Sequence, residues 1–247
     1  MVYLNELKKG TGMEKGKRLY EGKAKILFET DDPDLLIQRF KDDATAFDGI
    51  KKGTIIGKGI ANNTISAYLF ELLAKERIKS HFEKKLSDTE MVIKNVEIIP
   101  VEVVIRNVST GSLCKRYGIK EGIAFKKPIV EFYYKDDALH DPLMNEDHIF
   151  GLEIAGTEEI AEMRQQALKI NEILQRFFDS IDVTLVDLKL EFGRFKGKVL
   201  LADEISPDTC RFWEKGTNRK LDKDRFRHDL GDVEKTYKEM MKRIVGD

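Results

Sequence analysis

Residues 183–213 read VTLVDLKLEFGRFKGKVLLADEISPDTCRFW, and this stretch decides how the rest of the chain is interpreted. Apolar and charged residues alternate strictly over residues 186–192, which is typical of a β-strand with one face in the core. Gly193 and Gly197 then bracket a short turn, and residues 199–205 return as a second strand. The pattern therefore predicts a β-hairpin.

The charged residues of this hairpin are the first sign of a functional site. If its strands pair in an even register, odd-numbered positions lie opposite one another. Carboxylates gathered on such a face repel one another unless a divalent cation and phosphate oxygens balance their charge. A solvated sheet face is the alternative, but the ionisable residues that follow, as far as Arg211, favour the edge of an active site. The predicted charged face consists of Asp187, Lys189, Glu191 and Asp203.

The composition is that of an ordered, globular protein. The chain has 247 residues, enough for one large domain or two small lobes on a shared core, and 41% of them are hydrophobic. A net charge of −1 argues against nucleic acid as the main partner. Because there is no run of eighteen apolar residues and no signal-peptide pattern, we expect no membrane partner. Cys114 and Cys210 give no disulfide framework, which favours a reducing, cytoplasmic compartment.

Two lysines near the N-terminus form a second candidate site. Residues 1–16 are polar and aperiodic, and we expect a mobile tail there. A β-hairpin is predicted next, with its turn at Gly22. Lys23 and Lys25 alternate with apolar residues, so both ammonium groups are expected on one face of the second strand, where they can lie over a polyphosphate. Exposed lysines also protect edge strands from aggregation, and this alternative stays open.

The middle of the chain predicts a central sheet that contains a buried arginine. Residues 90–98 and 100–107 are rich in β-branched residues and read as central strands. An unpaired buried guanidinium is costly, so Arg106 needs an anionic partner, either a core carboxylate or a ligand. The turn at residues 109–112 opens a helix and suits a phosphate or carboxylate group, although a plain helix cap would use the same residues. Further predicted elements are a strand at 35–40, a polar loop at 41–52 and a helix at 57–79.

The C-terminal half predicts one more strand, a long loop and two helices. Residues 129–135 read as the strand, and the acidic residues 136–148 have the composition of a functional loop. Apolar stripes predict one helix that Thr157 caps and another at residues 222–245. No linker separates domains cleanly. The expected parts are the tail at 1–16, an N-terminal antiparallel β part at 17–100 and a C-terminal α+β part at 101–247.

Short segments in a fixed order also resemble a known family. The chain has no GxxxxGK[ST], HRD or DFG motif, which excludes P-loop and protein-kinase assignments. The segments that match a known family are LYEGKAK (19–25), AFDG (46–49), PVEVVIRN (100–107), GSL (111–113), HDP (140–142), KLEFG (189–193) and DEISPD (203–208) followed by RFW (211–213). With these segments the chain resembles the phosphoribosylaminoimidazole-succinocarboxamide synthase (SAICAR synthetase) family. Thr209 and Cys210 depart from the small hydroxyl residues or glycine common in that family, which leaves their role open.

The resemblance implies both a fold and a reaction. The fold is α+β, ATP-grasp-like or kinase-like, with ATP between the N-terminal antiparallel sheet and the C-terminal part. The resemblance implies an ATP-dependent ligase of de novo purine biosynthesis that uses ATP and Mg²⁺. It joins L-aspartate to 5-amino-1-(5-phosphoribosyl)imidazole-4-carboxylate through an acyl phosphate and releases SAICAR, ADP and phosphate. No serine or cysteine nucleophile is needed, because the substrate carboxylate attacks ATP.

Site residues follow from the same resemblance, position by position. The implied catalytic residues are Lys189 and Asp208, and the implied Mg²⁺ ligands are Glu191 and Asp203. The implied nucleotide contacts are Lys23, Ala24, Lys25, Ile98, Val101, Lys135, Glu191 and Asp203. The implied contacts to the other substrates are Asp48, Arg106, Ser112, Asp141, Lys189, Asp208 and Arg211.

Two alternative functions have to be weighed. A related ATP-dependent carboxylate–amine ligase with another acceptor would share the ATP site, but the matches at Arg106 and Arg211 disfavour it. A nucleotide-binding protein without catalysis would be expected to have lost Glu191 or Asp203, and both are present. The expected partners are the three small-molecule substrates and a second copy of the chain, with a dimer favoured. Which carboxylate, if any, acts as base for the aspartate amine stays open.

Overall fold

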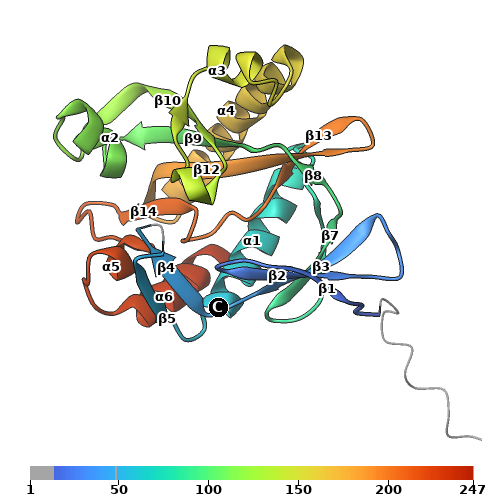
Figure 1. The fold of residues 1–247 in the computed structure, drawn as a ribbon. Helices are drawn as coiled ribbons and strands as arrows, with labels where there is room; N and C mark the ends of the chain where they lie inside the picture. Colours follow the sequence, from blue (N-terminus) through green and yellow to red (C-terminus); the bar gives the residue numbers. More distant parts are fainter. Residues whose placement is uncertain (1–13, 48, 247) are drawn as a thin grey trace, which may run out of the picture.

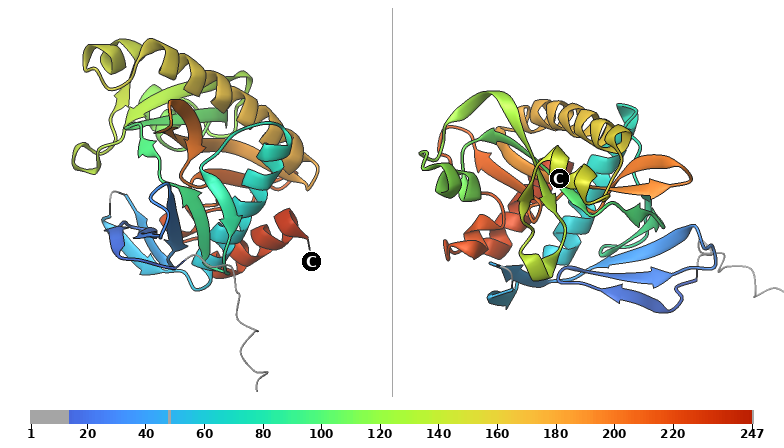
Figure 2. Two further views of the ribbon diagram at one scale, coloured as in Figure 1. Left: turned by 90° about the vertical axis from the view of Figure 1, so that its right-hand side faces the viewer. Right: turned by 45° about the horizontal axis from the view of Figure 1, so that its top comes forward.

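Two antiparallel sheets and a long helix between them form the body of the molecule. The structure, a computed structural model, describes residues 14–47 and 49–246. Most of the predicted tail therefore lies outside the described residues, while the Gly16 N–H donates to the Glu29 carbonyl at 2.9 Å. In Figure 1 the N-terminal sheet lies below the C-terminal sheet, with α1 (Lys58–Lys75) between them. The two further views in Figure 2 show α4 (Thr157–Asp179) along the outer side of the C-terminal sheet.

The N-terminal sheet has five strands in the order β1-β2-β3-β7-β6. The predicted hairpin around Gly22 and the strand at 35–40 are both present. A short strand of largely exposed residues, FEKK, was not predicted, because it lacks an apolar pattern. The helix α1 covers the inner face but ends at Lys75, four residues before the expected end, since Arg77 has a left-handed φ of 65°. The strands are β1 (Arg18–Glu21), β2 (Lys25–Glu29), β3 (Leu35–Phe40), β7 (Glu90–Lys94) and β6 (Phe82–Lys85).

The predicted polar loop at 41–52 is wrong. The structure has a two-stranded hairpin there, formed by β4 (Asp43–Ala46) and β5 (Lys51–Thr54). Its buried side chains include Ala44, which packs with Tyr237 of the C-terminal helix. Alanine carries little hydrophobic signal in a sequence, so the segment reads as polar although one side of it is buried.

The C-terminal sheet follows the order β11-β10-β9-β12-β13, and two further strands also pair with β12. The strands predicted at 90–98, 100–107 and 129–135 are confirmed in position, except that the first is divided into β7 and β8. The main core lies between this sheet and the helices α1 and α4. The strands are β8 (Glu97–Ile98), β9 (Val101–Val108), β10 (Ala124–Tyr134), β11 (Leu143–Met144), β12 (Val183–Phe195), β13 (Lys198–Ala202) and β14 (Cys210–Glu214).

The hairpin of β12 and β13 is confirmed, but its predicted even register is wrong. Glu191 lies opposite Ala202, so odd positions face even ones. A two-residue turn at Lys196 and Gly197, both with positive φ, fixes this pairing. The second strand also ends at Ala202 rather than at residue 205. Asp203 then adopts a φ of 62°, and this left-handed turn returns its side chain to the cavity that Glu191 lines.

The predicted single helix at 222–245 is also wrong, because the chain forms two helices there. They are α5 (Asp224–Arg227) and α6 (Val233–Val245), and residues Asp229, Gly231 and Asp232 between them all have positive φ. Leu230 of the predicted apolar stripe is exposed, whereas Phe226 of α5 packs in one cluster with Tyr237 of α6. The remaining elements are α2 (Gly111–Tyr117), the 3₁₀ helix η1 (Asp137–Leu139) and α3 (Glu146–Gly151), the last two within the acidic loop.

Candidate active site

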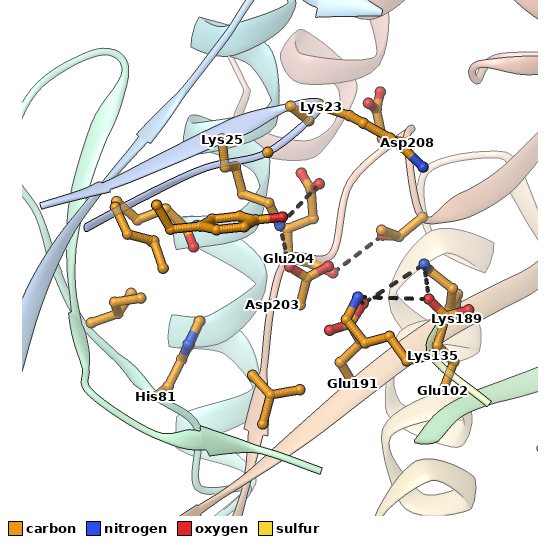
Figure 3. A pocket seen from close by; sticks show the side chains of 18 of the residues that line it. Lys23, Lys25, His81, Glu102, Lys135, Lys189, Glu191, Asp203, Glu204 and Asp208 are labelled. Atoms are coloured by element: carbon orange, nitrogen blue, oxygen red, sulfur yellow. Dashed lines mark hydrogen bonds and ion pairs between the residues drawn. The ribbon is translucent and has the colours of Figure 1, made fainter. Parts of the chain in front are cut away.

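A cavity of about 590 Å³ lies between the two sheets. The turn after β1 and the inner faces of β2 and β3 form one wall, and β12 with residues 203–209 forms the other. Figure 3 shows Lys25 directed toward Asp203 and Glu204, and Lys135 and Lys189 directed toward Glu191. The cavity therefore contains two clusters of opposite charges.

The first cluster joins β2 to the segment after β13. The Lys25 ammonium pairs with Asp203 and lies 3.4 Å from a Glu204 oxygen. Burial opposes both charges, yet the carboxylates raise the pKa of Lys25, and Lys25 with Lys189 lowers the pKa of Asp203 to about 2. Burial raises the pKa of Glu204. Lys23 lies in the turn before β2 and pairs instead with Asp137 at 2.7 Å, so the two predicted lysines reach different carboxylates.

The second cluster lies on β12 and its neighbours. The Lys135 ammonium donates to Glu191 at 2.7 Å, and the Lys189 ammonium is 3.7 Å from the same carboxylate. Lys189 also donates to Glu102 of β9, which the sequence did not suggest as a site residue. Burial raises the pKa of Glu102. Burial would lower the pKa of Lys189, but Glu191 and Glu102 raise it, so the ammonium stays charged.

The predicted metal ligands fit Mg²⁺, although they do not form a complete cage. No group of three or more His, Cys, Asp or Glu side chains in residues 14–47 and 49–246 is arranged to hold a metal ion. Mg²⁺ is usually held by one or two carboxylates together with substrate phosphates and water. Glu191 and Asp203 line the same cavity, and they are hard oxygen donors of the kind that Mg²⁺ requires.

A third cluster surrounds Asp208, one of the two predicted catalytic residues. Its carboxylate accepts hydrogen bonds from the ammonium groups of Lys58 and Lys223, each at 3.1 Å, and from the Tyr237 hydroxyl at 2.6 Å. Burial opposes its charge, but the two lysines lower the pKa of Asp208 well below its usual range. Lys58, Lys223 and Tyr237 were not predicted, because no local pattern links Asp208 to residues that lie 150, 15 and 29 positions away.

A second cavity of about 290 Å³ adjoins the first and contains the predicted arginines. Arg211 donates to Asp187 at 2.7 Å and to Asp224 at 2.8 Å. Arg106 donates to Asp187 and to Ser112 Oγ, both at 3.1 Å, and also pairs with Glu131. Core carboxylates are therefore the anionic partners that Arg106 requires.

The residues that line both cavities mark where they meet. They include the two predicted catalytic residues and come from β12, from the turn after β13 and from the segment before α5. The shared residues are Lys189, Asp208, Thr209 and Lys223.

The other predicted residues divide into three groups. Ala24, Ile98 and Asp141 line the larger cavity. Val101 is fully buried at the start of β9 and is not among the residues that line the cavity. Asp48 lies outside the described residues.

Comparison with known proteins shows which family this arrangement belongs to. The family model described as SAICAR synthetase matches residues 18–244. The chain belongs to the SAICAR synthetase family. Phosphoribosylaminoimidazole-succinocarboxamide synthase from Thermoanaerobacter sp. strain X514 is 58% identical over 95% of this chain and 100% of the relative. The enzyme of that name from Chloroherpeton thalassium is 57% identical over the same shares.

Solved structures of the SAICAR synthetase family have the same fold. The structure from Ehrlichia chaffeensis superposes with a TM-score of 0.91 at 46% identity, over 92% of this chain and 98% of that one. A structure described as SAICAR synthetase in complex with ADP gives a TM-score of 0.90 at 49% identity, over 94% and 98%. These comparisons confirm the expected α+β fold and the expected enzyme, an ATP-dependent ligase of purine biosynthesis. No helix in residues 14–47 or 49–246 is long and apolar enough to span a bilayer.

Proposed function

We propose that the larger cavity holds ATP with Mg²⁺, that the smaller cavity holds the imidazole ribonucleotide, and that the phosphoryl group passes between them. The observation that carries this proposal is the junction of the two cavities. Lys189 and Asp208 line both, so a group transferred there can touch each substrate. Phosphoryl transfer depends mainly on positioning and on neutralising charge, and the junction supplies both signs of charge.

The larger cavity has a charged end and an apolar end, as ATP requires. Lys25 and Lys23 stand at the charged end and would hold the phosphates. Leu27, Leu36 and Ile98 line the apolar part, where a purine ring would be enclosed. Glu191 and Asp203 would hold Mg²⁺, which, when bound, neutralises charge on the β- and γ-phosphates.

The smaller cavity has the charge needed for a ribonucleotide. The imidazole ribonucleotide carries a phosphate and a carboxylate, and the carboxylates of the larger cavity would repel both groups. Arg211 and Arg106 both line this cavity, and Arg106 also donates to the Ser112 hydroxyl at 3.1 Å. An arginine fork matches phosphate oxygens in a bidentate geometry. We therefore assign the 5′-phosphate to Arg211 and Ser112, with Arg106 behind them.

The reaction then proceeds in two steps at the junction. A carboxylate oxygen of the imidazole attacks the γ-phosphorus, the bond to the β-phosphate oxygen breaks, and ADP leaves. The aspartate ammonium group first loses a proton to water, and the resulting amine attacks the acyl carbon. Phosphate departs with the former carboxylate oxygen, and the nitrogen loses a second proton to water as the amide forms. Lys189 stabilises charge on the transferred group, while the ionised Asp208 would accept a hydrogen bond from the aspartate ammonium.

Oxygen-18 in the imidazole carboxylate tests this route. If the carboxylate attacks ATP, one labelled oxygen per turnover appears in inorganic phosphate, which mass spectrometry of the released phosphate would detect. Unlabelled phosphate would mean that no acyl phosphate forms and that the junction of the cavities has another use. A ligase with a different acceptor would show no turnover with this ribonucleotide at all.

The remaining proposals concern the oligomeric state, the location and the partners of the enzyme. We propose that it works as a homodimer in the cytoplasm, with neither nucleic acid nor membrane as a partner. The net charge of −1 and two cysteines without a disulfide framework support this setting. Sedimentation equilibrium would give twice the chain mass for a dimer.

A further inference from the structure

One row of buried polar side chains on α1 has no role in the reaction described above. Lys58, Asn62 and Ser66 follow one another at intervals of four residues, so they share one face of the helix, and all three are fully buried. A buried charge is costly, and a well-packed apolar side chain in its place is often as stable or more stable. Packing alone therefore does not explain why this row is polar.

The row contacts the segment after β13 that carries Asp208. Lys58 Nζ donates to Asp208 Oδ2 at 3.1 Å, and Ser66 Oγ donates to the Ile205 carbonyl, also at 3.1 Å. Because these two residues are the ends of the row, α1 runs alongside residues 205–208 and holds the segment at both ends.

A second helix holds the same carboxylate. Tyr237 of α6 is 1% exposed, and its hydroxyl donates to Asp208 Oδ1 at 2.6 Å. Tyr237 and Ala61 of α1 belong to one buried apolar cluster, so the two donors come from helices that pack together. Neither Lys58 nor Tyr237 is among the described residues that line the two cavities, whereas Asp208 lines both. The two donors can therefore act on the substrates only through Asp208.

These contacts fix the direction of the Asp208 carboxylate. The Asp208 N–H donates to Ser206 Oγ at 3.1 Å, so the turn itself holds the backbone. Lys58 and Tyr237 then hold one carboxylate oxygen each. A carboxylate has about four acceptor positions, and Lys58, Lys223 and Tyr237 use three of them. The position that is left can accept a hydrogen bond from a substrate.

We infer that Lys58 and Tyr237 are positioning residues for L-aspartate, which hold the Asp208 carboxylate in the direction from which it accepts a hydrogen bond from the aspartate ammonium. This inference deepens the proposed function and rests on it, since it assumes that Asp208 binds that ammonium. A hydrogen bond weakens steeply as it bends, so a small rotation of the carboxylate matters. Loss of either donor should weaken the use of L-aspartate but not the binding of ATP, whose phosphates are assigned to Lys23 and Lys25.

Tyr237→Phe tests this inference by removing a single oxygen atom. The variant should lower kcat/KM for L-aspartate by about tenfold, while the Kd of ATP from isothermal titration stays unchanged. Tyr68→Phe is the matched control, since Tyr68 of α1 packs against Phe177 and does not line either cavity. Unchanged kcat/KM for L-aspartate in Tyr237→Phe, or an equal loss of ATP affinity, would overturn the inference.

A double-mutant cycle separates positioning from general support of the fold. Lys58→Met should lower kcat/KM for L-aspartate in the wild-type enzyme but have little further effect in Asp208→Asn, because it acts through that carboxylate. Additive losses would mean that Lys58 supports the fold instead, and would overturn the inference. If Asp208→Asn alone leaves kcat/KM for L-aspartate unchanged, the proposed role of Asp208 is wrong and the inference falls with it. If Asp208→Asn does not fold, Tyr237→Phe decides alone.

Discussion

Glu191 and Asp203 carry much of the proposed chemistry at the scale of single residues. Each pairs with a lysine in the larger cavity, so these charges balance before substrates bind. ATP brings negative charge that the lysines can take up, which leaves the two carboxylates available for Mg²⁺. The same four side chains would therefore serve both the resting and the substrate-bound enzyme.

Removing one of these carboxylates should stop catalysis without unfolding the protein. Glu191→Ala is expected to lower kcat by roughly 10²–10³-fold, because the metal loses one of its two carboxylate ligands. Glu97→Ala is the matched control, since Glu97 is an exposed residue of β8 away from the cavity clusters. Near-normal turnover of Glu191→Ala at saturating Mg²⁺ would contradict the metal assignment.

Replacing Arg106 or Arg211 should weaken the binding of the ribonucleotide but not that of ATP. Arg211→Ala should weaken ribonucleotide binding by about 2–5 kcal/mol, because a desolvated charged contact is lost. Arg106→Ala should also weaken binding of the ribonucleotide, because the Ser112 hydroxyl would lose the hydrogen bond from Arg106. Isothermal titration with the ribonucleotide, and separately with ATP, measures both effects. Equal losses for both ligands would mean that the arginines support the fold or the nucleotide site instead.

Turns between helices and strands position the site residues. These turns are also the features that the sequence patterns did not predict. The alternation in 186–192 predicted β12 and its hairpin correctly. The register depended on the positive φ of Lys196 and Gly197, which alternation does not encode. For the same reason the break before α6 was missed, because an apolar stripe can continue across a turn. Asp203 reaches the site only through its own left-handed backbone.

Gly111 tests the importance of such a turn. It has a φ of 58°, and a Cβ atom there would come within 2.9 Å of Arg211 Nη2. Gly111→Ala should therefore displace Arg211 and weaken ribonucleotide binding while leaving ATP binding unchanged. Gly118→Ala, at the other end of α2, has similar backbone strain at φ 62° but meets nothing within 4 Å. Similar ribonucleotide affinity in the two variants would show that the contact with Arg211 is unimportant.

At the scale of the whole molecule, distant segments meet at Asp208. Lys58 of α1, Lys223 before α5 and Tyr237 of α6 all bind its carboxylate. Ordered motifs in the sequence predicted a catalytic role for Asp208, but its partners were not foreseen, because pairing between residues 15 to 150 positions apart leaves no local pattern. The pairing of Lys189 with Glu102, which lies 87 residues away in the sequence, was not foreseen for the same reason. Motifs therefore predicted residues that the structure places at the cavities, whereas the ion pairs among them could be recognised only in the folded structure.

This cluster predicts how stability depends on pH. The folded pKa of Asp208 lies below its unfolded value of about 3.9, so its contribution is present above that pH and is lost as the pH falls below it. Asp208→Asn should lower the free energy of unfolding at pH 7 by about 3–5 kcal/mol, because buried ion pairs are broken. It should also flatten the decline below pH 4. Urea unfolding at pH 7, 4 and 3 measures both effects, and parallel pH profiles would contradict the assignment.

The central claim, that one junction couples ATP cleavage to amide formation, is tested most directly by ADP release. Purified enzyme is given ATP, Mg²⁺, the imidazole ribonucleotide and L-aspartate, and each is omitted in turn. We predict one ADP per SAICAR in the complete mixture and no steady ADP release without the ribonucleotide. Steady ADP release without the ribonucleotide, or equal turnover with another amine in place of L-aspartate, would contradict the account.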